Sequence, residues 1–135
     1  MNPDRKLKWL AIAAIVFGAL TVFSGGRALF GGEAARAELG HIVSFVLWFN
    51  FLAGFAYALA GAWLLRAMRW AASAALFLAV STVLVFLAFA AHILAGGAFE
   101  MRTVVALSLR SLFWIVLAIV ALRVAKPTLS GNTPR

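Results

Sequence analysis

Long apolar segments separated by short polar ones dominate the pattern of the chain, and their expected limits are residues 7–24, 41–65, 70–94 and 103–122. A helix of about 20 apolar residues crosses the roughly 30 Å hydrocarbon core of a bilayer. Each segment is close to or above that length. The pattern therefore predicts an all-α integral membrane protein, with four transmembrane helices arranged as an antiparallel up-down bundle.

The longest apolar stretch, residues 40–94, contains no proline and only two charged residues, Arg66 and Arg69. As one helix it would be roughly 80 Å long, more than twice the thickness of a bilayer core. We therefore expect it to fold back at a short inner turn, residues 66–69. This hairpin places His41 and His92 on the same side of the membrane.

The remaining segments are expected to connect or flank the spans. Residues 25–40 and 95–102 are predicted outer loops with glycine pairs and charged residues, and residues 34–39 favour a short interfacial helix. The tail, residues 127–135, is expected to be disordered. The basic lead and short first apolar run also fit a signal peptide, but no A-x-A cleavage site follows at a suitable distance, so we expect a retained signal anchor.

Flanking charges predict the orientation. Eight of the 12 Lys and Arg residues fall on the side of the termini and the inner turn, and four fall on the other side. By the positive-inside rule both termini are then cytoplasmic, and Trp9, Trp63 and Trp70 lie where an aromatic belt is expected. These features predict one multi-pass domain, residues 1–135, in a bacterial inner membrane.

Composition supports the bilayer as the solvent. Of the 135 residues, 65% are hydrophobic and 12% are charged, against roughly 25% charged in soluble domains. The net charge of +8 comes from residues that flank apolar segments, which suits anionic lipid headgroups rather than nucleic acid. Because the chain has no cysteine, disulfides, thiolate nucleophiles and Cys-ligated metal sites are excluded within it.

Polar residues within or beside the spans concentrate in the predicted outer half, whereas the inner half holds little beyond Tyr57 and small hydroxyls. Polar side chains at membrane depth need partners and are the first candidates for function. The candidates for binding a ligand or partner are Glu38, His41, His92, Glu100, Arg102 and Arg110.

His41 and His92 are expected at similar depth on neighbouring helices. Two neutral imidazoles so placed are candidate axial ligands of a haem b, or ligands of a metal ion together with Glu38 or Glu100. The alternative is structural: His41 reaches the interface, and His92 donates a hydrogen bond to a nearby carbonyl. The sequence lacks the H-x-x-x-H and H-x-x-E-H spacings and leaves both interpretations open.

Arg110 lies seven residues into the fourth predicted span, roughly 10 Å below its outer end. A lipid-facing arginine there is unfavourable, so the side chain should snorkel, face the bundle or pair. Pairing with Glu100 or Glu38 is one expectation, and a clamp for an anionic headgroup or substrate is the functional alternative. Trp114, four residues on, shares its face and is a candidate stacking partner.

A row of small and polar residues in the second span predicts helix packing. Its members are Asn50, Gly54, Tyr57 and Gly61. Small residues let membrane helices approach closely, and polar ones hydrogen-bond across the interface. The row favours a contact with a neighbouring helix or with another subunit.

No catalytic constellation is present: the chain has no G-x-S-x-G elbow, no paired carboxylates within a span and no glycine-rich phosphate loop. The sequence thus favours a noncatalytic accessory or interaction subunit with an outward-facing polar cluster. Its expected partners are the lipid bilayer and another membrane protein or a second copy. The alternatives are a haem- or metal-binding redox protein using His41 and His92 and, third, a small oligomeric transporter or channel.

Overall fold

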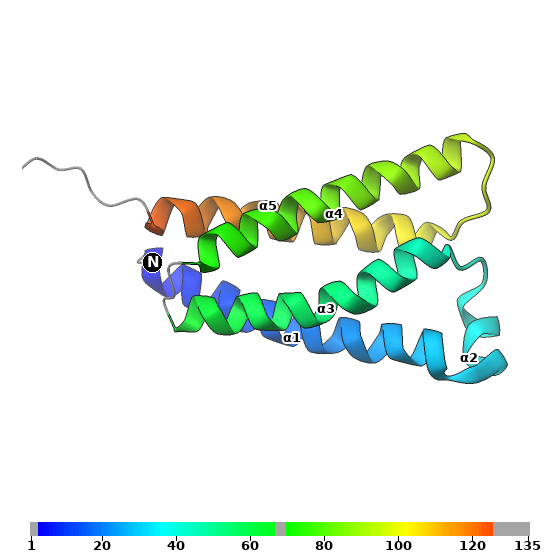
Figure 1. Ribbon diagram of the computed structural model, residues 1–135, viewed down its shortest axis with the longest axis horizontal. Helices are drawn as coiled ribbons and strands as arrows, with labels where there is room; N and C mark the ends of the chain where they lie inside the picture. Colours follow the sequence, from blue (N-terminus) through cyan, green and yellow to red (C-terminus); the bar gives the residue numbers. More distant parts are fainter. Residues whose placement is uncertain (1–2, 67–69, 126–135) are drawn as a thin grey trace, which may run out of the picture.

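The computed structural model describes residues 3–66 and 70–125, and within them every regular element is a helix (Figure 1). In chain order the helices are α1 (Pro3–Phe30), α2 (Gly32–Leu39), α3 (Ser44–Leu65), α4 (Ala71–Leu94) and α5 (Met101–Ala125). The predicted all-helical class is confirmed. The inner turn expected at 66–69 and the tail at 127–135 lie largely or wholly outside the described residues.

The four long helices form a bundle of two closely packed pairs, α1 with α3 and α4 with α5 (Figure 1). The beginning of α1 and the end of α5 lie at one end of the molecule, which we call the terminal end. The short helix α2 and the connection between α4 and α5 lie at the opposite end, which we call the loop end.

All four long helices are long and apolar enough to cross a membrane. Large apolar side chains also remain uncovered around the bundle, for example Phe77 at 70% and Phe23 at 71% exposure. Apolar surface on this scale is unfavourable in water and is expected where lipid is the solvent. These features indicate a multi-pass membrane protein.

Helix α1 is longer than the predicted first span. The sequence predicted a loop from residue 25, yet the helix continues through Gly25 and Gly26 to Phe30. The reason is packing: a Cβ atom on Gly25 would lie 3.1 Å from Cβ of Phe51, so this glycine lets α1 and α3 approach. At 28 residues α1 is roughly 42 Å long, so it either tilts or extends beyond the hydrocarbon core.

The other boundaries differ by a few residues. Helix α3 begins at Ser44 rather than at residue 41, because Gly40 has a φ of +72° and interrupts the helix. Helix α5 begins at Met101 and so takes in two residues of the predicted second loop. The expected short helix at 34–39 is present as α2 and starts at Gly32.

Small residues explain the close packing of α1 on α3. A Cβ atom on Gly18 would lie 2.6 Å from backbone atoms of Ala58 and Gly54, and one on Gly61 would lie 2.7 Å from the Ala11 carbonyl oxygen. Such backbone approach is the usual way in which membrane helices gain van der Waals contact.

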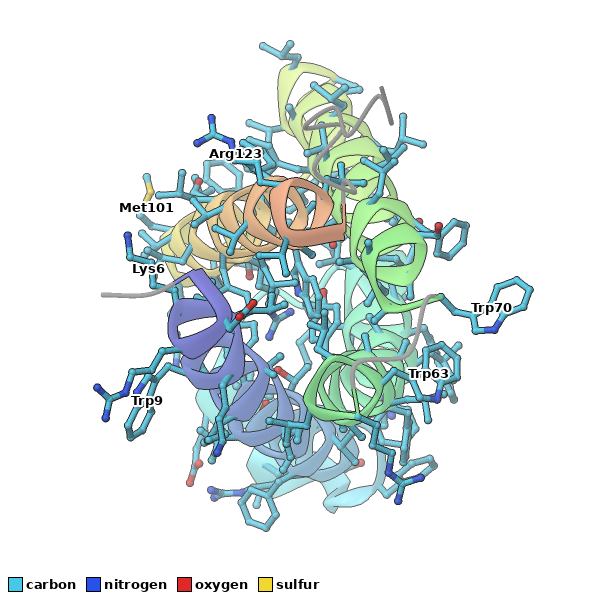
Figure 2. All side chains as sticks on the ribbon, turned by 90° about the vertical axis from the view of Figure 1, so that its left-hand side faces the viewer. Lys6, Trp9, Trp63, Trp70, Met101 and Arg123 are labelled. Atoms are coloured by element: carbon cyan, nitrogen blue, oxygen red, sulfur yellow. The ribbon has the colours of Figure 1, made fainter. Side chains whose placement is uncertain are left out.

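Two clusters of buried side chains fill the bundle. The larger includes Tyr57, Trp114 and Leu117, each fully buried, and a smaller one joins Val46, Phe89 and Leu107. By contrast, Trp9, Trp63 and Trp70 point outward around the terminal end (Figure 2). The interior is therefore closed by core side chains, while these tryptophans face the surroundings.

Candidate functional site

A pocket of about 240 Å³ lies at the loop end between α1, α3, α5 and the segment that links α2 to α3. We call it the loop-end pocket. Its lining residues are Ser24, Leu39, His41, Ile42, Val43, Leu47, Asn50, Glu100, Arg102, Thr103 and Ala106. Of the candidate binding residues from the sequence, the pocket brings together His41, Glu100 and Arg102.

Glu100 ties the two connections at the loop end together. Its Oε1 accepts a hydrogen bond from the backbone N–H of His41 at 3.0 Å, although the two residues are 59 positions apart. Gly40 makes this approach possible, because a side chain there would collide with the Glu100 carboxylate. The carboxylate is thus held at the mouth of the pocket, where it bonds to a backbone group.

Glu38 lies beside this mouth and has a different partner. Its carboxylate forms an ion pair with Arg27 at 3.2 Å between Oε2 and Nη2, with both side chains more than half exposed. Exposed pairs of this kind contribute little to stability. The Arg102 guanidinium donates to the Glu38 backbone carbonyl at 3.4 Å, which joins the start of α5 to the end of α2.

His92 has different neighbours from His41. Its ring stacks on Phe89 and meets Phe45 edge-on, and its Nε2 lies 3.0 Å from the Ala98 carbonyl oxygen. His41, by contrast, lines the loop-end pocket. One histidine thus supports the turn after α4, and the other belongs to the pocket.

Few side chains that could bind a metal ion lie close together in the described part of the chain. Across residues 3–66 and 70–125, no group of three or more His, Asp or Glu side chains is arranged to hold a metal ion. With Nε2 of His92 at the Ala98 carbonyl, only Nδ1 of that ring is left as a possible ligand of a haem or metal ion. The contact with Ala98 matches the hydrogen bond that the structural interpretation of His92 expects.

Arg110 is buried inside the bundle, with 9% of its surface exposed. Its Nη2 lies 3.4 Å from the Thr21 hydroxyl, and its guanidinium carbon lies 5.4 Å from the centre of the Phe17 ring. The remaining nitrogens, Nε and Nη1, have no hydrogen-bond partner among the described residues. The expected pairing with Glu100 or Glu38 is wrong, because those carboxylates bond to His41 and Arg27.

Aromatic rings pack beside Arg110 toward the middle of the bundle. Phe17 stacks on Tyr57 at 5.9 Å and contacts Phe113 at 5.6 Å, while Tyr57 contacts Trp114 at 4.7 Å between ring centroids. The cation–π contact of Arg110 is thus with Phe17, whereas the sequence suggested Trp114. Tyr57 also shares a hydrogen bond of 3.4 Å with Thr82 of α4, so this layer joins all four long helices.

Three of the four residues predicted to pack against a neighbouring helix lie inside the bundle, and the fourth, Asn50, lies at the loop-end pocket. Gly54 and Gly61 lie against α1, and Tyr57 belongs to the aromatic layer. Asn50 lines the loop-end pocket instead, and its buried Oδ1 has no hydrogen-bond partner in the described part of the chain. An unsatisfied buried amide oxygen costs about 1–3 kcal/mol, so a donor brought by water or a ligand would stabilise it.

Sequence reasoning missed the contributions of α1. Thr21 and Ser24 are spaced by three residues and therefore share a face with Phe17, which lies four residues before Thr21. Ser24 lines the pocket and Thr21 contacts Arg110. The signal was present as two hydroxyls in an apolar run, but isolated hydroxyls are common in membrane helices and do not indicate a site by themselves.

Fold and site together define a multi-pass membrane protein, a helical bundle with a pocket at one end that His41, Glu100 and Arg102 help to line. No known protein family matches the chain, and comparisons with curated proteins and with solved structures gave no match.

Proposed function

We propose that the chain is a noncatalytic accessory subunit of a bacterial inner membrane and that its loop-end pocket binds a partner or a small ligand on the outer side. The bundle would be an antiparallel up-down arrangement with both termini in the cytoplasm. Support for this orientation comes from the eight-to-four distribution of basic residues between the two sides.

One observation carries the proposal: charged and polar side chains enter the mainly apolar lining of the loop-end pocket, and a buried amide oxygen, Asn50 Oδ1, lacks a hydrogen-bond partner among the described residues. Native proteins rarely bury such groups without satisfying them. The mouth is formed by His41 and Arg102, which are both exposed and therefore accessible to an incoming group. A hydroxyl or N–H group of the bound molecule, or a water held beside it, would supply the missing donor.

The aromatic layer next to Arg110 favours binding over transport. Tyr57 and Trp114 are fully buried and in contact, and Phe17 stacks on Tyr57. A path from the pocket to the terminal end would have to displace these rings. The pocket is therefore better suited to hold a group than to pass it across the bilayer.

The proposal is tested by placing a photoreactive amino acid at position 41, at the mouth of the pocket, in cells. We expect a discrete crosslinked adduct with one partner protein or a second copy, identified by mass spectrometry. The matched control is position 77, where Phe77 is 70% exposed on the apolar surface and should react mainly with lipid. A chain that purifies as a strict monomer and gives no adduct from position 41 would contradict the accessory role.

A further inference from the structure

Arg110 carries a buried charge that the described chain does not neutralise. Its exposure is 9%. Within residues 3–66 and 70–125, two of its three guanidinium nitrogens have no hydrogen-bond partner, and the third makes only a 3.4 Å contact with Thr21. The two carboxylates that the sequence offered as partners of Arg110 bond to other groups: Glu38 to the Arg27 guanidinium and Glu100 to the His41 backbone N–H. A charge buried without a partner is among the most unfavourable arrangements in a protein, and at membrane depth it marks a functional site.

The loop-end pocket lies directly above this charge on α5. Thr103 and Ala106 line the pocket, and Arg110 follows at spacings of seven and four residues, so the three residues share one face of the helix. Side chains in a helix lean toward its N-terminus, which for α5 is the loop end. The Arg110 side chain is therefore expected to extend toward the loop end, where its Nη2 meets Thr21; Arg110 itself is not among the residues that line the pocket.

Helix α1 makes the same connection. Ser24 lines the pocket, and its hydroxyl donates to the Thr21 carbonyl oxygen one turn deeper at 3.3 Å. The Thr21 hydroxyl in turn is the contact of Arg110. On both α1 and α5, the residues that line the pocket are thus about one helical turn, or roughly 5.4 Å along the axis, from the residue that holds or contacts the guanidinium.

The chemistry at this position suits an oxyanion. Arg102 and one carboxylate, Glu100, line the pocket, and Glu100 already accepts a backbone N–H. Arg110, four residues after the lining residue Ala106, adds a second positive charge next to the pocket. Arg110 has no partner at Nε or at Nη1 among the described residues, and each of these nitrogens shares one edge of the guanidinium with Nη2. Because Nη2 has two N–H groups and contacts Thr21 with one, the other can pair with Nε or Nη1 to bind two carboxylate or phosphate oxygens. A volume of about 240 Å³ equals that of several waters at roughly 30 Å³ each, which is enough for such a group.

We propose that Arg110, reached through the loop-end pocket, binds an oxyanion group, a carboxylate or a phosphate, carried by a small solute or a lipid headgroup. This inference rests on the proposed binding role of the pocket and names the chemistry of what it binds. The stacked ring of Phe17 beneath the guanidinium closes the site on the far side, so the group enters from the loop end.

The test uses the full chain purified in an uncharged detergent, with inorganic phosphate and acetate as probes and sodium chloride at equal ionic strength as the reference. A ligand that binds the folded state raises the thermal midpoint, which circular dichroism measures. A second arm reconstitutes the chain with phosphatidylcholine alone or with added phosphatidylglycerol and counts retained lipids by native mass spectrometry. A response to phosphate or acetate identifies a free oxyanion, and selective retention of phosphatidylglycerol identifies a headgroup; either supports the proposal.

Two variants locate the site. Arg110→Met removes the charge, and we expect it to need at least tenfold more probe for the same shift, or to lose selective retention of phosphatidylglycerol. Ala106→Leu keeps Arg110 but fills the pocket floor above it, and it should weaken binding in the same direction. Arg123→Met, an exposed arginine near the other end of α5, is the matched control and should respond like the unaltered chain.

The variants also separate binding from folding. Without probe, Arg110→Met should melt no lower than the unaltered chain, since it removes an unpaired buried charge; if this variant does not fold, Ala106→Leu decides. No response to any probe or lipid, or an equal response in Arg110→Met, would overturn the oxyanion site. If that happens while crosslinking from position 41 persists, the accessory role stands and only the oxyanion site is lost.

Discussion

Glu100 joins two connections that are far apart in the sequence, and Gly40 makes the contact possible. Gly40 has a φ of +72° and lies against the Glu100 carboxylate, which accepts the His41 N–H. Both features depend on the absence of a side chain at position 40. The loop-end pocket should therefore be sensitive to a single methyl group at this residue.

We predict that Gly40→Ala lowers the free energy of unfolding by about 2–4 kcal/mol, through backbone strain and loss of the Glu100 hydrogen bond. Gly96→Ala is the matched control, because Gly96 also has a positive φ, +86°, but has no atom within 4 Å of the added Cβ. It should show the strain alone, about 1–2 kcal/mol. Reversible unfolding in mixed micelles measures both, and equal losses would contradict the role given to Glu100.

The sequence predicted which candidate residues lie at the same end of the bundle better than it predicted their partners. Hydropathy and charge placed His41, Glu100 and Arg102 near one another, and the pocket contains all three. The same reasoning paired Arg110 with a glutamate, whereas the structure gives it Thr21 and Phe17. Spacing along a helix determines depth and face, but which helix meets that face depends on how all four pack.

At the scale of helices, the principal difference from prediction is the extent of α1. The sequence predicted the start of a loop at Gly25 and Gly26, because each glycine in a helix costs about 1 kcal/mol relative to alanine in water. In the structure the helix continues, and Gly25 provides the contact with Phe51 of α3. Within a bilayer the backbone must satisfy its own hydrogen bonds, which offsets the intrinsic cost of glycine.

Gly18 and Gly26 offer a matched pair for testing the packing of α1 on α3. An added Cβ at Gly18 would lie 2.6 Å from backbone atoms of α3, whereas one at Gly26 would be 3.5 Å from the Phe51 ring. We predict that Gly18→Ala costs about 1–3 kcal/mol, because the helices must separate. Gly26→Ala should be neutral or stabilising by up to about 1 kcal/mol. Unfolding by denaturing detergent measures the difference, and equal effects would rule out close backbone packing at Gly18.

At the scale of the whole molecule, polar chemistry is concentrated at the loop end. The loop-end pocket, the Glu100 contact and the Arg27–Glu38 ion pair all lie there, while fully buried aromatic residues occupy the interior beyond Arg110. This asymmetry suits a subunit that presents one end to a partner or ligand. It has that meaning only if the loop end faces the outside of the cell.

The orientation of the bundle is therefore the most direct test of the account. An alkaline phosphatase fused after Gly31, at the loop end, should be active because it is exported. One fused after Met68, between α3 and α4, should be inactive because it stays in the cytoplasm. Comparable expression of both fusions is the control. An inactive fusion after Gly31 together with an active one after Met68 would place the pocket in the cytoplasm and contradict the proposed outward-facing function.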